Sequence, residues 1–317
     1  MKRSFTKVLF STCLLSFVGG AMAQESPSSF WNGTRNYKVT VTNLVHGTPT
    51  SLIPATSNTS TNPSGSPYSV FVGTACPDNG GAGTRRVGEM LGLWVFATHD
   101  QYFQLFTLGQ PAMRELAMLS QTGRPFFLRD ALIAMDKTWD VFSLPSSFPP
   151  PNGPFGIVLC PGESLTTTVQ ATGANNYLSL AAMIFPTNDG FVGLSGVPLP
   201  TGLNAVTYYS PAYDSGSEEN DEVCGNIPSL IVAGFPFPLK TVVGGGGKVP
   251  GGNCPDGGGN DNDINSDFTN PASPDNDPAR AEGYVGIHPG IRGIGDLDPK
   301  VWGWDGNALK VTIQRID

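Results

Sequence analysis

The sequence predicts an all-β protein, and three observations support this prediction. Its 317 residues include 40 Gly and 28 Pro, which implies many turns. Short β-branched segments alternate apolar and polar residues, as strands with one buried face do. The similar alternation of residues 37–44 and 308–316 suggests that the first and last strands are neighbours. We therefore expect one antiparallel β-sandwich with one helix and one long loop insertion.

The first 23 residues have the character of a secretory signal peptide. The charged start MKRSFTK precedes a short apolar segment that ends at the small-residue motif AMA. That segment is too short to span a bilayer comfortably, and no later stretch of about 18 apolar residues occurs. We expect a secreted or periplasmic protein with no transmembrane segment, in which residues 24–36 form an N-terminal extension to a domain over 37–317.

The expected strands follow in chain order. Residues 37–44, YKVTVTNL, place Val39 and Val41 on one face. Residues 92–100, GLWVFATHD, are apolar almost throughout, which is typical of a central strand. Further expected strands lie at 163–172 and 176–189, in the segments GFVGL, AVTYYS and GYVGIHPGIRGIGDL, and at 308–316.

One segment changes to helical periodicity. Residues 108–125, LGQPAMRELAMLSQTGRP, place Met113, Leu116 and Ala117 at helical spacing. Pro111 suits a first helical turn, and Gly123 with the following proline provides a stop signal. The sequence therefore predicts one helix here.

The segment from about 225 to 280 differs from the rest. It is rich in Gly, Asp, Asn and Pro and lacks periodicity after Val243, which indicates a loop insertion. Its acidic stretch from Asp256 to Asp267 lacks the glycine and the glutamate of a calcium-binding EF-hand loop. We expect this stretch to be a flexible polar loop.

The mature chain contains four cysteines, and an even number in an exported protein suggests two disulfides. The sequence leaves three pairings open. We favour Cys224 with Cys254, because both flank the Gly/Asp-rich insertion, and this choice leaves Cys76 with Cys160.

Charge is distributed unevenly along the chain. The net charge of −8 disfavours nucleic acids and anionic membranes as partners. Five carboxylates and no basic residue lie between Asp214 and Glu222, and Asp189 follows an apolar strand at a turn. In an antiparallel sandwich two such loops can meet at one end, where carboxylates repel one another unless a cation neutralises them. Oxygen ligands on irregular loops favour calcium, with Asp189, Asp214 and Glu218 as its ligands.

The alternative for this loop is an acidic patch that only contacts water. We expect that description to hold for Glu219, Asp221 and Glu222, which lie further along the loop.

An enzyme is the alternative function. The pair His99–Asp100 needs a nucleophile or a metal, and neither Gly-x-Ser-x-Gly nor His-Glu-x-x-His occurs. We therefore expect a structural histidine. His288, before a proline, could lie near the acidic loops, but a turn residue is the simpler interpretation. The acidic cleft could also serve a metal-assisted hydrolase that acts on polysaccharide, although only three tyrosines near it could stack on sugars.

Five segments, in order, resemble the spondin N-terminal domain of F-spondin and mindin, which also occurs as a stand-alone exported bacterial protein. They are YKVTVTNL, ATHDQYFQLFTLGQPAMRELAMLSQTG, YLSLAAMIFPTNDGFVGL, PAYDSGSEENDE, and EGYVGIHPGIRGIGDL running to ALKVTIQRI. The resemblance covers Tyr37 to Ile316 outside the insertion, which is larger than we expect of the animal domains. The thrombospondin repeats of the animal proteins are missing.

The resemblance implies a sandwich similar to calcium-dependent lipid-binding domains, with a metal ion among acidic loops at one end. The family's turn aspartate matches Asp189, and the first aspartate of its acidic loop matches Asp214. Glu218 departs from the family, because it places a longer glutamate where animal members have aspartate. The implied function is a non-catalytic calcium-binding adhesion or ligand-binding module whose partner is an unknown extracellular protein or glycan.

Overall fold

The computed structural model describes the parts of the chain that build a β-sheet, two helices and the loops at one end. The expected signal peptide, the insertion at about 225–280 and all four cysteines of the expected disulfides (Cys76, Cys160, Cys224 and Cys254) lie outside the described residues. The described residues are 33–45, 48–50, 85–87, 90–144, 159, 161–185, 187–220, 222, 282–295, 299 and 303–317.

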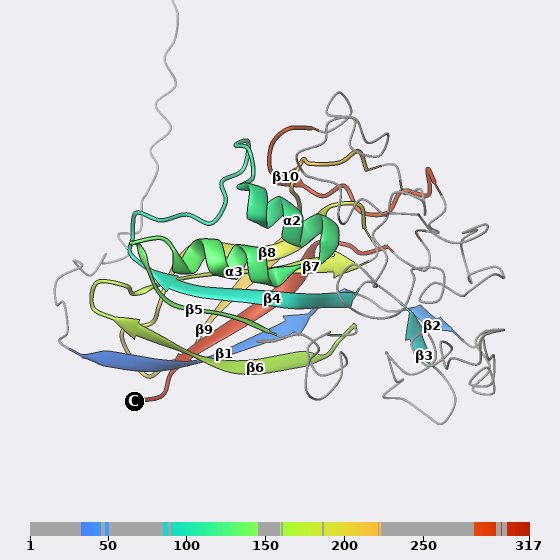
Figure 1. Cartoon of the computed structure of the whole chain (residues 1–317). Helices are drawn as coiled ribbons and strands as arrows, with labels where there is room; N and C mark the ends of the chain where they lie inside the picture. The colour runs from blue at the N-terminus through green and yellow to red at the C-terminus, as the bar shows by residue number, and fades with distance from the viewer. Residues whose placement is uncertain are drawn as a thin grey trace, which may run out of the picture.

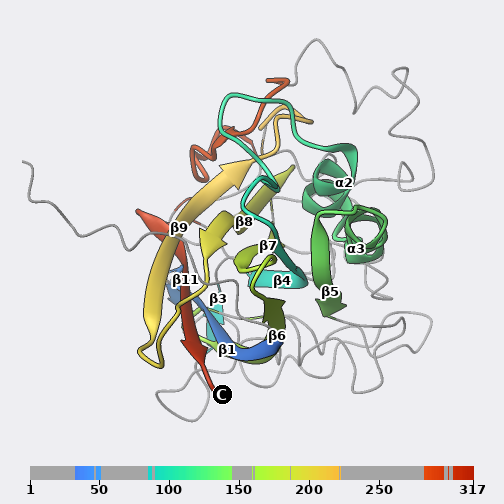
Figure 2. The ribbon, with the colours of Figure 1, turned by 90° about the vertical axis from the view of Figure 1, so that its left-hand side faces the viewer.

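The main sheet is antiparallel and nearly closes into a barrel (Figures 1 and 2). Its strand order is β5-β4-β7-β8-β9-β11-β1-β6, with β10 paired to β9, while β2 and β3 form a separate pair. The strands are β1 (Thr34–Asn43), β2 (Thr48–Thr50), β3 (Arg85–Val87), β4 (Met90–His99), β5 (Thr138–Leu144), β6 (Ser164–Thr172), β7 (Tyr177–Phe185), β8 (Gly190–Pro198), β9 (Val206–Asp214), β10 (Gly286–Ile287) and β11 (Asn307–Arg315). The all-β prediction is confirmed, and the sheet has the form of an incompletely closed barrel.

Side chains link the two ends of the strand order. Gln170 in β6 faces Thr98 in β4 and Asp140 in β5. The Thr98 hydroxyl donates to the backbone carbonyl of Gln170 at 2.7 Å, and the backbone amide of Gln170 donates to the Asp140 carboxylate at 2.6 Å. These bonds replace part of a backbone ladder, so the sheet nearly closes without a regular strand pair at this seam.

The first and last strands are neighbours, as their similar alternation predicted. β1 pairs with β11 from Tyr37 opposite Arg315 to Asn43 opposite Leu309. Val39 and Val41 are buried, whereas Lys38 is exposed, so the period of two matches the buried face. β1 already begins at Thr34, within the expected N-terminal extension.

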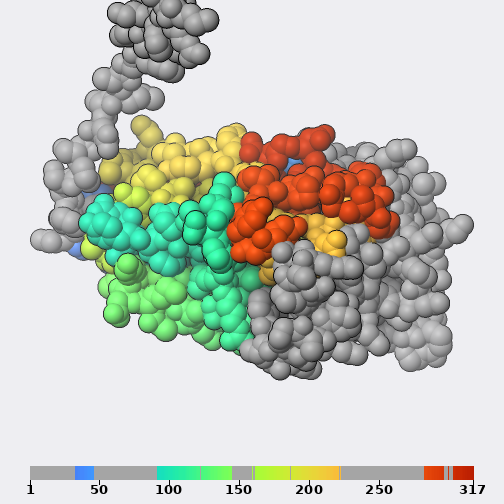
Figure 3. Space-filling view, turned by 90° about the horizontal axis from the view of Figure 1, so that it is seen from above, coloured from blue at the N-terminus to red at the C-terminus, as the bar shows by residue number. Residues whose placement is uncertain are grey.

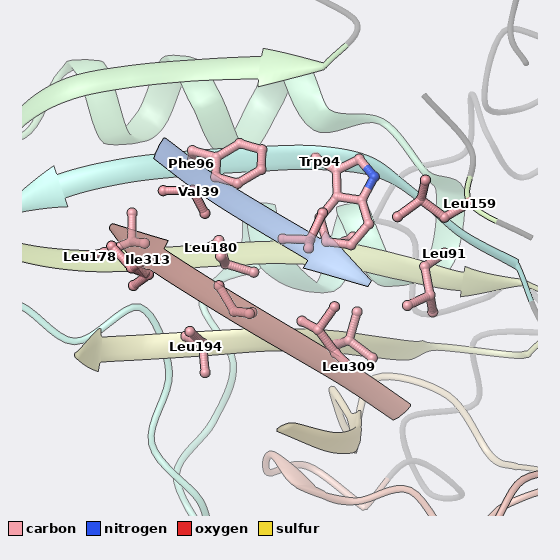
Figure 4. Packing of buried hydrophobic residues seen from close by; sticks show 14 of the residues in the cluster. Val39, Leu91, Trp94, Phe96, Leu159, Leu178, Leu180, Leu194, Leu309 and Ile313 are labelled. Carbon is pink, nitrogen blue, oxygen red and sulfur yellow. The ribbon is translucent and has the colours of Figure 1, made fainter. Parts of the chain in front are cut away.

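Two hydrophobic cores lie on opposite sides of β4, β7 and β8. The first fills the barrel and contains Trp94, Phe96 and Leu180 together with residues of β1 and β11 (Figure 4). The second lies between the sheet and the helices, where Leu116 and Leu128 are fully buried. β4, β7 and β8 therefore bury both faces, which explains their continuous apolar sequences.

The prediction of a single helix is wrong, because two helices cover this face of the sheet. α2 (Arg114–Thr122) ends at Gly123, whose φ of 61° is left-handed, as the stop signal predicted. Pro125 then begins α3 (Pro125–Ile133) instead of terminating the region. Proline at a first helical position lacks only an amide that has no intrahelical partner, so it can start a helix as well as stop one. None of the described helices is long and apolar enough to cross a membrane.

Candidate metal centre

Asp189 and Asp214 lie side by side at one end of the sheet. Asp189 immediately precedes β8, and Asp214 is the last residue of β9. Gly190 and Asp214 are register partners, and the Ser215 amide donates to the Asp189 carbonyl at 3.3 Å. The antiparallel ladder therefore brings together two loops that are separated by an entire strand hairpin.

The two oxygens of the Asp189 carboxylate differ sharply. Oδ2 accepts hydrogen bonds from the amides of Ser217 and Glu218 at 2.7 and 3.1 Å, and from the hydroxyls of Ser215 and Ser217 at 2.9 and 3.0 Å. Oδ1 is buried and has no hydrogen-bond partner. Asp189 is 0% exposed, so this oxygen faces the interior and not bulk water.

The Asp214 carboxylate is also buried, at 4% exposure. Its Oδ1 accepts the Gly216 amide at 2.6 Å, and its Oδ2 accepts the Asn220 side-chain amide. Burial, and then the negative charge of Asp189, raise the pKa of Asp214 to about 8. Burial likewise raises the pKa of Asp189. The pair therefore resists holding two negative charges unless a cation accompanies them.

Glu218 lies on the same loop, half-buried. Its main chain contacts the site directly, because its amide is one of the donors to Asp189 Oδ2. Among the described residues, no three His, Cys, Asp or Glu side chains are already arranged as a metal cluster. The ligand role of Asp189, Asp214 and Glu218 thus remains a prediction.

The loop after β9 is held by residues that lack any sequence signal. Ser120, buried in α2, is within hydrogen-bond distance of the Ser215 hydroxyl at 2.9 Å. Gly216 has a φ of 70°, and a Cβ there would lie 2.2 Å from the Tyr284 carbonyl oxygen. Only glycine fits this position, so a bend of fixed shape presents the Ser217 and Glu218 amides to Asp189.

Glu222 was expected to face solvent, and this expectation is wrong. Glu222 is only 3% exposed. Its carboxylate accepts the amides of Arg292, Gly293 and Ile294 at 2.5, 2.7 and 3.0 Å. Three successive amides form a pocket for a carboxylate, and this arrangement has no counterpart in the local sequence. Glu219 is exposed, as expected, and Asp221 lies outside the described residues.

His288 lies beside the carboxylates. A Cβ on Gly190 would be 3.1 Å from its ring carbon Cδ2. Nδ1 accepts the Gly290 amide at 3.1 Å, so the proton of the neutral ring is on Nε2, which is buried without a partner. Burial and the charge of Arg292 lower the pKa of His288 to about 4. A neutral ring that carries its proton on Nε2 is a donor there and not a metal ligand.

His99 is fully buried at the last position of β4, away from the end where Met90 pairs with Phe185 near Asp189. Its Nδ1 donates to the Asp100 carbonyl at 2.7 Å, and its Nε2 is 2.8 Å from the Ser179 hydroxyl. The Asp100 carboxylate accepts the amides of Tyr102 and Phe103 and so closes a turn. Both side chains therefore have structural partners within the fold.

Comparison with known proteins adds no assignment: no family model matches this chain, and no curated protein sequence matches it. Its similarity to the spondin N-terminal domain therefore remains a prediction from the five segments described above.

Proposed function

We propose that this chain is an exported, non-catalytic spondin-type domain that binds calcium through Asp189, Asp214 and Glu218. In this proposal the strands form the sandwich of that family, and the ion fixes the loops that contact an extracellular protein or glycan. Secretion and disulfides belong to the same proposal, because the signal peptide and the cysteines provide their only support.

One observation carries the metal assignment: Asp189 Oδ1 is a fully buried carboxylate oxygen with no donor. Buried polar atoms nearly always have a partner, and an unpartnered one costs several kcal/mol when charged. Four donors gather on Oδ2 and none on Oδ1, so the loop is organised around one oxygen while the other is available. A cation is the partner that suits an acceptor beside a second carboxylate.

The donor set suits calcium better than zinc. The surrounding groups are carboxylate, amide and hydroxyl oxygens on loops, and the nearby histidine presents a protonated nitrogen. Calcium accepts an irregular shell of 6–8 oxygens, whereas zinc prefers four nitrogen or sulfur ligands. When bound, calcium supplies the positive charge that lets both aspartates ionise. The residues of the chain then hold the loops in place.

A polysaccharide hydrolase has weaker support. Asp189 and Asp214 are 0% and 4% exposed, so a sugar chain cannot reach them without movement of the loops. Glycosidase acids instead line an open cleft on both sides of the scissile bond.

Calorimetric titration of the chelator-treated full chain with CaCl₂ tests the proposal, together with thermal melting at each calcium concentration. Binding to the folded state alone adds RT ln(1 + [L]/Kd), about 2.7 kcal/mol at a hundredfold excess over Kd. Asp189→Asn is expected to abolish both the heat of binding and this stabilisation.

Asp136→Asn is the matched control, because it makes the same chemical change at an exposed aspartate before β5. It should titrate like the wild type. A wild-type chain whose melting temperature ignores both calcium and chelator would contradict the proposal.

A further inference from the structure

The end of the sheet that carries Asp189 and Asp214 is formed by two segments, one before and one after residues 223–281 in the chain. The segment that precedes them includes Gly216 and Glu222, and residues 282–295 follow them. The Gly283 amide donates to the Gly216 carbonyl at 2.9 Å, and the Glu222 carboxylate holds the amides of residues 292–294. In Figure 3 the 282–295 segment, in orange-red, lies on the surface beside the end of β9 and its loop, in yellow-orange.

Glu282 is an exposed residue at the start of this second segment. Partial burial raises the pKa of Glu282, and the negative charges of Asp189 and Glu219 raise it further. A favourable interaction with the Asn220 side chain lowers this pKa in part. The Gly283 amide, which donates to the Gly216 carbonyl at 2.9 Å, places this exposed third carboxylate next to the loop that follows Asp214.

Asn220 connects this carboxylate to the buried pair. Its amide nitrogen donates to Asp214 Oδ2, and the residue is only 7% exposed. Its Oδ1 is buried without a hydrogen-bond partner, as is Asp189 Oδ1. The cluster thus contains two buried acceptor oxygens that lack donors. Hydrogen bonds within the cluster do not satisfy them, and a hard cation is a partner that suits acceptor oxygens beside two carboxylates.

We infer that Glu282 completes the cation site from the far side of residues 223–281, with Asn220 Oδ1 as a further ligand, so that cation binding ties together the two ends of that segment. This inference rests on the proposed function and adds a regulatory role to the same site. Without the ion, Glu282 stays at the rim because it is repelled by the two aspartates. With the ion, the exposed side chain turns inward and stabilises the contact between Gly283 and Gly216.

Calcium titration of the full chain compares the wild type with two variants. Glu282→Gln removes a ligand charge and should weaken calcium binding about tenfold or more. Glu219→Gln removes the same charge from an exposed neighbour and should stay within about threefold of the wild type, because long-range attraction between exposed charges is screened. Circular dichroism verifies that both variants fold.

Amide hydrogen exchange read by mass spectrometry gives an independent readout. In the wild type, calcium should slow exchange at Gly283, Val285 and residues 292–294, and in Glu282→Gln this protection should be lost at the same calcium concentration. Glu282→Asp, which keeps the charge on a shorter arm, should restore part of it.

The outcomes separate the two proposals. If the wild type binds calcium and Glu282→Gln binds equally well, or if exchange at 283–294 ignores the ion, the inference on Glu282 is wrong and the calcium site stands. If the wild type binds no calcium, both are wrong.

Discussion

Two buried carboxylates on the same end of the molecule have opposite environments. Glu222 is 3% exposed, and its two oxygens accept three backbone amides, with the Arg292 guanidinium 3.9 Å away. Asp189 is 0% exposed, and one of its oxygens has four donors while the other has none. Both are buried acids in an acidic neighbourhood, yet only one of them has its charge fully compensated by the chain.

This difference separates a structural role from a binding role. A buried carboxylate stabilises a fold when hydrogen bonds satisfy all of its charge, and it destabilises the fold when they do not. Glu222 belongs to the first class and joins its loop to residues 292–294. Asp189, together with Asp214, belongs to the second class, which is where a cation finds its site.

The largest expected effect comes from breaking the Glu222 contact. Glu222→Ala leaves three partly buried backbone amides without their carboxylate acceptor and should cost about 3 kcal/mol in the free energy of unfolding, measured by urea titration. Glu222→Gln keeps one acceptor oxygen and should cost about half of that. A loss below about 1 kcal/mol in the alanine variant would show that the contact is not structural.

A smaller effect should appear as a pH dependence of the metal-free protein. The folded-state pKa of Asp214, about 8, is above its ordinary value of 3.8. Between these values the folded chain holds a proton that the unfolded chain has released, so stability falls as pH rises. The slope is at most about 1.4 kcal/mol per pH unit, which gives a loss of about 2 kcal/mol between pH 6 and 8.

Calcium should cancel this loss, because it binds the ionised carboxylates and competes with the proton. Unfolding in urea at pH 6, 7 and 8, with chelator and with excess calcium, measures both curves. Asp214→Asn should reduce the slope in chelator, and the raised pKa of the buried Asp189 should keep part of it. A wild-type protein whose stability in chelator stays flat over this range would mean that the aspartates are compensated by groups of the chain.

The sequence revealed most of the strands because their pattern is local. Val39 and Val41 alternate with polar residues, and continuous apolar residues mark β7, so period and burial could be predicted from the segment itself. The near-closure of the sheet could not be predicted, because it depends on Gln170 meeting Thr98 and Asp140 across strands that are distant in the chain. The second helix was missed because the local signal of Pro125 is ambiguous.

The site was predictable to a similar degree. A turn aspartate after an apolar strand and an acidic loop after another strand were sufficient to place Asp189 beside Asp214. The burial of Glu222 could not be predicted, because its partners are backbone amides about seventy residues later in the chain, and backbone amides carry no sequence signal. Glu282 could not be connected to the site for the same reason, because residues 223–281 separate it from the acidic loop.

The smallest expected effect is at His99, whose ring nitrogens, like the carboxylate oxygens of Glu222, all have hydrogen-bond partners. The Gly196 amide donates to the Ser179 hydroxyl at 2.9 Å, the hydroxyl donates to His99 Nε2, and Nδ1 donates to the Asp100 carbonyl. Each proton thus has one acceptor, and burial lowers the pKa of His99, which keeps the ring neutral.

Ser179→Ala removes the central hydroxyl of this series of hydrogen bonds. It should lower the free energy of unfolding, measured in urea, by about 1.5 kcal/mol, because it leaves the Gly196 amide and the His99 Nε2 without partners. Ser179→Thr keeps the hydroxyl and separates its loss from the effect of volume. Neither variant should change the calcium affinity, because His99 lies at the end of β4 opposite to the one that pairs with Phe185 beside the acidic turn. A change in calcium affinity in the alanine variant would mean that the two ends are coupled, and that the partners of a buried group do not suffice to separate structural residues from binding residues in this fold.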